Sequence, residues 1–286
     1  MKFAMLGVAS IVALTLAVPA AAQDIGTPSP DSLSAVYTGK AYSPFAKRTF
    51  PERPLWGDSH LHTSLSMDAG GFGNRVGLRD AYRLARGEEI TASSGQPVRL
   101  SRPLDWLAIT DHSDGLGFII DTLAAVPLVT QYEQGARWSK GFNAGGQEAV
   151  DTTLDLIGTF SQGKVDPEMF ANYSPGSRRY ATIWEDVIQA AEEFNDPGRF
   201  TTFIGFEWTS LVKGGNMHRN VIFRDGADRA RQVVPFTTQA PIGSTDPLDL
   251  YKDLEDYEAK TNGAAMAFAH NGNLSNGIMF PVDAQY

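Results

Sequence analysis

Short apolar runs recur from residue 54 to the end of the chain, and polar turns separate them. Their length and composition predict five strands, because strands that are covered on both faces read as uninterrupted apolar segments. Three stretches instead have apolar residues at helical spacing and predict helices near residues 78–86, 183–194 and 247–262. The predicted strands lie at residues 54–63, 104–110, 200–206, 217–223 and 264–269.

Because these strands alternate with helices, the pattern favours parallel pairing and an α/β layer or barrel. Local signals support the last helix, since Asp246 is a good N-cap, Pro247 suits the first turn and Gly263 follows the end. Residues 114–178 show no single period. We interpret them as an insertion that forms a lid or cap with some helix.

The N-terminus has the pattern of a secretory signal peptide over residues 1–22. Lys2 precedes an apolar run, and Ala20, Ala21 and Ala22 form a small-residue cleavage site. An uncleaved membrane anchor is the alternative, although the run is short for a spanning helix. Residues 23–53 are rich in Pro, Ser, Thr and Gly, which predicts an extended lead-in. We therefore expect a periplasmic or secreted protein that has no membrane association after cleavage.

The composition of the chain limits which metal ligands and which binding partners are possible. The chain has no cysteine, so any transition metal must be held by His, Asp and Glu. Its formal net charge is −9, which argues against a nucleic-acid partner, because phosphate-backbone binding needs a basic surface. The oligomeric state is left open.

The five histidines of the chain all lie at or beside predicted strands. His60 and His62 lie in the first strand, where alternate residues point to one face about 6.5–7 Å apart. Imidazole and carboxylate together suit Zn, Mn or Fe. The carboxyl ends of parallel strands converge, so these side chains could meet at one metal site. The expected ligands are His60, His62, His112, Glu207, His218 and His270.

Other residues are assigned weaker roles. Asp58 and Asp111 are close to the histidines in sequence and could orient them or act in acid–base steps. Lys213 and Arg219 could bind an anionic substrate group, or could be ordinary solvated charges. Taken singly, each histidine is more often a structural residue than a ligand. The serines have no G-x-S-x-G context, which argues against a serine hydrolase.

Several segments, taken in order, resemble the polymerase-and-histidinol-phosphatase (PHP) superfamily of metallohydrolases. They are Gly57-Asp58-Ser59-His60-Leu61-His62-Thr63, Thr110-Asp111-His112, Gly205-Phe206-Glu207-Trp208, His218 and Ala269-His270. With the segment Arg102-Pro103-Leu104-Asp105-Trp106, the chain more narrowly resembles the exported bacterial branch catalogued as domain of unknown function 3604.

That resemblance implies a distorted (β/α)7 barrel over residues 54–286, with two or three divalent ions at the strand ends. It implies a phosphoesterase in which water activated by the ions attacks a small anionic ester. The chain departs from the family pattern in two respects: Ser59 stands where the family usually has an apolar residue, and no closing Asp-x-His motif follows His270. We therefore expect the barrel to be incomplete and the chain to be the front part of a longer protein.

Two other functions stay open at this point. Amidohydrolase-type barrels also begin with H-x-H, but they often use a bridging lysine where Glu207 stands here. A non-catalytic periplasmic module that binds a metal or ligand would also account for the histidines.

Overall fold

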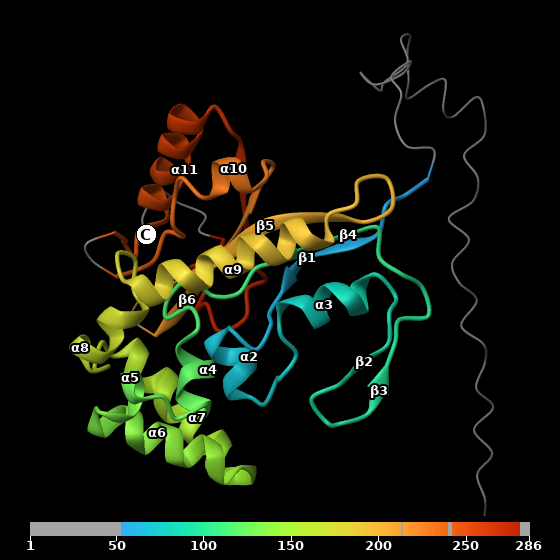
Figure 1. Cartoon of the computed structure of the whole chain (residues 1–286). Helices are drawn as coiled ribbons and strands as arrows, with labels where there is room; N and C mark the ends of the chain where they lie inside the picture. The colour runs from blue at the N-terminus through green and yellow to red at the C-terminus, as the bar shows by residue number, and fades with distance from the viewer. Residues whose placement is uncertain (1–52, 213, 240–241, 281–286) are drawn as a thin grey trace, which may run out of the picture. The chain divides into compact units, whose positions relative to one another are not determined.

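A computed structural model of the chain describes residues 53–212, 214–239 and 242–280 (Figure 1). The predicted signal peptide, nearly all of the lead-in, and Lys213 lie outside the described residues. Within the described part, no helix combines the length and apolar character that a membrane span needs.

The structure is a mixed α/β fold built on a five-stranded mixed sheet, and all five predicted strands are present. The strand order is β1-β4-β5-β6-β7, with parallel pairs β1–β4 and β4–β5 and antiparallel pairs β5–β6 and β6–β7. The strands are β1 (Gly57–Leu61), β4 (Trp106–Ile109), β5 (Thr201–Val212), β6 (Gly215–Phe223) and β7 (Ala265–Ala269).

The expectation of parallel pairing is therefore wrong for β6. Only two residues separate β5 from β6, and parallel neighbours need a crossover of a dozen residues or more. The two strands form a hairpin, and β5 extends to Val212, beyond the predicted end near residue 206.

Three helices confirm the predictions from apolar spacing: α3 (Leu78–Ala85), α9 (Arg178–Phe194) and α11 (Pro247–Thr261). Figure 1 shows α9 lying along β5, where its buried side chains Ile183, Trp184 and Val187 join the main hydrophobic core. The Asp246 side chain accepts a hydrogen bond from the Leu248 backbone N–H, which confirms the predicted N-cap.

Four small elements have no counterpart in the sequence prediction. Two are the short helices α2 (Met67–Gly71) and α10 (Ala227–Ala230). The other two, β2 (Ile90–Thr91) and β3 (Pro97–Val98), form a separate two-stranded antiparallel sheet. Such elements are too short to show a period.

Residues 118–173 are mostly helical and have a hydrophobic core of their own, which includes Phe118, Trp138, Leu156 and Tyr173. Figure 1 shows these helices grouped beside α2, in green to yellow. They are α4 (Phe118–Leu123), α5 (Pro127–Thr130), α6 (Glu133–Ala144), α7 (Gly146–Ser161), α8 (Pro167–Phe170) and the 3₁₀ helix η1 (Ala171–Tyr173).

A buried charge network joins this helical group to α9. Arg179 Nε and Nη2 donate to the Asp121 carboxylate, at 2.7 and 2.6 Å, and the Tyr173 hydroxyl donates to it at 2.8 Å. Because Asp121 is buried, this bidentate pairing offsets the desolvation of its charge.

The five-stranded sheet is strongly curled. The rings of His60 on β1 and His270 after β7 have centroids 4.4 Å apart, although β1 and β7 are the outer strands of the order. Four steps in a flat sheet would separate those strands by about 19 Å, at 4.7–4.9 Å a step. Curling thus brings one end of both outer strands together.

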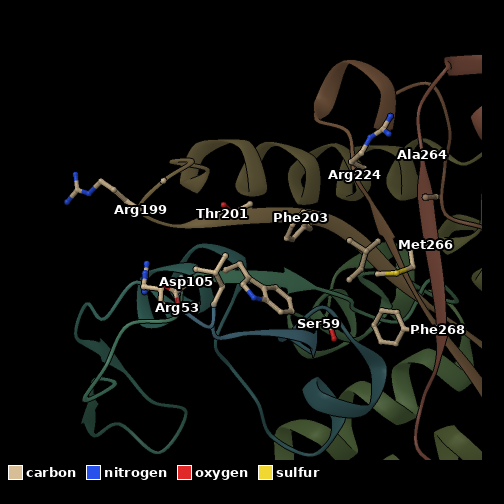
Figure 2. Close-up of a pocket in the computed structure, with 15 residues that line it drawn as sticks. Arg53, Ser59, Asp105, Arg199, Thr201, Phe203, Arg224, Ala264, Met266 and Phe268 are labelled. Atoms are coloured by element: carbon tan, nitrogen blue, oxygen red, sulfur yellow. The ribbon is translucent and has the colours of Figure 1, made fainter. Parts of the chain in front are cut away.

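Two cavities lie along the concave face of the sheet, one toward each end of β5. Thr201 and Phe203 line a cavity of about 730 Å³, and Glu207 and Thr209 line one of about 540 Å³ that holds all five histidines. Figure 2 shows the first cavity, where Phe203, Met266 and Phe268 form apolar walls between β5 and β7. The alternation of side chains along β5 places both sets on one face.

Candidate metal centre

Glu207 lies at the middle of the histidine-lined cavity and is 1% exposed. Its Oε2 atom is 2.8 Å from His62 Nε2, 3.4 Å from His112 Nδ1 and 3.6 Å from His60 Nε2. Its Oε1 atom is 3.3 Å from His218 Nδ1. One carboxylate therefore contacts four of the five imidazoles.

The sheet topology explains this convergence. His112 follows β4, and its backbone pairs with Glu207 on the neighbouring β5. β6 runs the opposite way, so His218 near its start lies opposite Thr209 of β5, at the same end of the sheet. Residues that follow β4 and residues near the start of the antiparallel strand β6 therefore lie at the same edge of the sheet.

Thr209 holds two of the imidazoles. Its hydroxyl is 2.7 Å from His112 Nδ1 and 2.9 Å from His218 Nδ1. These contacts orient both rings toward Glu207, because each fixes the position of one ring nitrogen.

The ligand atoms form three groups in which all members lie within 4.8 Å of one another. Glu207 belongs to two groups, as does His112, so neighbouring ion positions would share ligands. The groups are His60, Glu207 and His270; His62, Asp68 and His112; and His112, Glu207 and His218.

Asp68 is a member of the cluster that the sequence analysis missed. It lies in the first turn of α2, with Oδ1 3.1 Å from His62 Nδ1 and Oδ2 3.5 Å from His112 Nε2. The Ser66 hydroxyl donates to Asp68 Oδ1 at 2.6 Å and fixes the carboxylate. A signal was present in the sequence, because Asp68 is the only acidic residue between His62 and the helix beginning at Leu78.

The charges of the cluster are strongly coupled. Burial by itself would raise the pKa of Glu207, but the surrounding histidines, above all His112, hold it well below the usual range. Asp68 behaves in the same way beside His112 and His62. Burial alone would lower the pKa of His62, yet the adjacent carboxylates of Asp68 and Glu207 raise it to about 10. These carboxylates stay ionised and attract a positive charge.

The residues fit a divalent ion. His62 Nε2 lies 2.8 Å from Glu207 Oε2, yet this atom and both Glu207 carboxylate oxygens are buried without a hydrogen bond of good geometry, which is costly for polar atoms unless something else binds them. Imidazole nitrogen with carboxylate oxygen is a donor set for Zn, Mn or Fe. We conclude that these side chains could hold metal ions.

The other predicted site residues have different surroundings. Asp58 is exposed, and its side chain accepts a hydrogen bond from the His60 backbone N–H. Asp111 is buried and accepts bonds from the Thr63 N–H and hydroxyl, at 2.6 and 2.7 Å. Neither lines the cavity, although Asp58 fixes the backbone of His60 in β1 and Asp111 fixes Thr63 beside His62.

Arg219 is buried on the opposite face of β6 from His218, as alternation along a strand requires. Its guanidinium donates to the Tyr251 hydroxyl and to the His218 and Met279 carbonyls, and it does not line the cavity. Lys213, its predicted companion in anion binding, lies outside the described residues.

Comparison with known proteins places the chain in a family. A family model described as "Protein of unknown function (DUF3604)" matches residues 49–286, which include every residue of the cluster. The chain belongs to the DUF3604 family. A search among curated proteins and a search among solved structures each found no match. The DUF3604 description names no activity, so the function must be argued from the cluster itself.

Proposed function

We propose that this DUF3604 protein is an exported, divalent-metal-dependent hydrolase of the PHP type that acts on a phosphoester. The observation that carries the proposal is the position of Glu207, a buried carboxylate shared between two groups of histidines. Adjacent ligand groups that share a carboxylate would hold two ions close together, as two-metal hydrolysis requires.

The ligands in this proposal are the six predicted residues together with Asp68, and they would hold two or three Zn, Mn or Fe ions. When bound, such ions activate water and neutralise charge that develops on the ester oxygens. The protein groups position the ligands: Thr209 orients His112 and His218, and Asp111 holds the backbone at Thr63 beside His62. Asp58 fixes the backbone of His60.

The proposal includes the distorted (β/α)7 barrel and export through a signal peptide at residues 1–22. The curled sheet supports the barrel, because the histidines of its outer strands already meet. Export rests on the sequence pattern alone.

The test combines metal content with turnover. The purified protein is loaded with Zn, Mn or Fe and assayed on p-nitrophenyl phosphate, bis-p-nitrophenyl phosphate, an amide panel and a lactone panel. We expect at least two ions per chain and hydrolysis of a phosphoester. The double variant His60→Ala/His62→Ala loses metal and turnover, and Glu148→Ala/Asp151→Ala, which removes two exposed carboxylates of α7, retains both.

The outcomes separate the alternatives. Hydrolysis of amides or lactones in place of phosphoesters would favour an amidohydrolase-type enzyme. Bound metal without turnover of any ester would favour a non-catalytic metal-binding module. An absence of bound Zn, Mn and Fe from the loaded wild-type protein would rule the proposal out.

A further inference from the structure

The cavity above the metal-ligand cluster has apolar walls. It has a volume of about 540 Å³, within the range of pockets that enclose small organic molecules. The walls come from α2, α7, β5 and the segment after β7. The apolar lining residues are Met67, Phe72, Leu156, Ile157, Phe160, Leu211 and Leu274.

Three of these side chains are exposed to solvent around the cavity. Phe72 is 58% exposed, Ile157 37% and Leu274 76%. They come from separate parts of the chain, at the end of α2, on α7 and after β7. Large exposed apolar side chains that gather at a cavity mark a surface that is covered by a ligand.

Apart from the histidines, the ionisable side chains that line the cavity are all acidic. Asp68, Asp114 and Glu207 contribute carboxylates, and the described lining residues include no lysine or arginine. Buried Asp114 accepts hydrogen bonds from the Thr238 backbone N–H and hydroxyl. Metal ions would therefore be the main positive charges that an anionic group meets there. This favours a substrate with one negative charge over a phosphomonoester with two.

We propose that the cavity selects a phosphodiester that carries an apolar arm, an alkyl chain or an aryl ring. The arm lies against Ile157 and Phe160 of α7 and against Phe72, while the ester group lies at the histidine cluster. Ile157 and Phe160 are three residues apart, so they share one face of α7. This inference rests on the proposed function for its ester group, but the apolar arm can be tested separately.

The first experiment measures kcat/KM for the p-nitrophenyl diesters of methyl, butyl and octyl phosphate. We expect the octyl ester to exceed the methyl ester at least tenfold, because each buried methylene adds binding free energy. Ile157→Ser should reduce this octyl-to-methyl ratio about fivefold, because the serine side chain removes apolar contact with the arm. Leu154→Ser is the matched control, since Leu154 is 57% exposed on the same helix and does not line the cavity.

A second variant and a binding readout complete the design. Leu274→Ser removes the most exposed wall residue, so it should leave folding intact and still reduce the octyl advantage. Calorimetry with methyl octyl phosphate and dimethyl phosphate, which lack a good leaving group, measures binding to the metal-loaded protein without turnover. We expect the octyl compound to bind at least tenfold more tightly than dimethyl phosphate, and Ile157→Ser to reduce that ratio.

The outcomes are distinguishable. Tighter binding of the octyl compound without turnover supports the apolar arm and contradicts the proposed hydrolase. Turnover with no dependence on chain length, in kcat/KM or in binding, overturns the inference and leaves the hydrolase intact. Faster hydrolysis of p-nitrophenyl phosphate than of every diester would overturn the choice of a singly charged substrate.

Discussion

At the scale of single residues, the two carboxylates Glu207 and Asp68 contribute to different numbers of ligand groups. Glu207 belongs to two of the three groups, whereas Asp68 belongs to one. Both carboxylates are ionised, since the neighbouring histidines, above all His112, lower their pKa values. Their neutral amide analogues keep the shape of the side chain but lose the charge that attracts an ion.

We therefore predict that Asp68→Asn lowers the metal content by about one ion per chain, and that Glu207→Gln lowers it further. Elemental analysis after loading and desalting measures both. Asp80→Asn, an exposed carboxylate of α3 paired with Arg83, is the control and should bind as much metal as the wild type. Equal metal content in Asp68→Asn and wild type would remove Asp68 from the set of ligands.

At the scale of elements, the β5–β6 hairpin decides which side chains enter the site. It reverses β6 and brings His218 to the edge where β4 ends.

Helix α11 shows a second effect at this scale, the free-energy cost of placing two like charges close together on one helix. Asp253 is partly buried and has Asp256 three residues away; burial, together with that charge, raises the pKa of Asp253 to about 6.

The raised pKa of Asp253 gives a pH-dependent stability with a defined sign. Above pH 6 the carboxyl is ionised in both states and destabilises the fold. The cost is lost as the pH falls from about 6 toward the unfolded pKa near 3.9. Asp253→Asn should thus raise Tm by about 2 °C at pH 8 and by progressively less at pH 6 and pH 5.

Thermal unfolding of the two proteins across these pH values measures the effect. Glu255→Gln, an exposed carboxylate on the same helix, controls for the change in net charge. A Tm difference for Asp253→Asn that is constant from pH 5 to pH 8 would contradict this explanation.

At the scale of the whole molecule, the cluster joins distant parts of the chain. Its ligands come from β1, α2, the segment after β4, β5, β6 and the segment after β7. An ion bound by such ligands favours the folded state, because the unfolded chain does not hold them together. Without an ion, His62 Nε2 and both Glu207 carboxylate oxygens are buried and lack a hydrogen bond of good geometry.

Removal of metal should therefore destabilise the protein. At a free metal concentration one hundred times Kd, binding adds about 2.7 kcal/mol, which corresponds to a Tm shift of about 5–10 °C. Differential scanning calorimetry with and without EDTA measures the shift. His60→Ala/His62→Ala should show a much smaller response, and a wild-type Tm that is indifferent to EDTA would contradict metal binding in the folded state.

The sequence alone predicted the strands, three of the helices and the six residues His60, His62, His112, Glu207, His218 and His270, which all line one cavity. These features depend on local periodicity and on residue type. Adjacent residues of a strand point to opposite faces, so the sequence also contained a reason to separate Arg219 from His218. The sequence did not show that the side chains of Asp58 and Asp111 would lie outside the cavity.

Only the tertiary structure decided the curl of the sheet, the entry of Asp68 into the cluster and the apolar walls above it. Each of these depends on contacts between segments far apart in the chain. Hydrophobic periodicity indicates which side chains are buried, but it does not indicate which other segment of the chain covers them. Strand pairing and helix packing settle that, and they place α7 and His270 beside residues of β1 and β5.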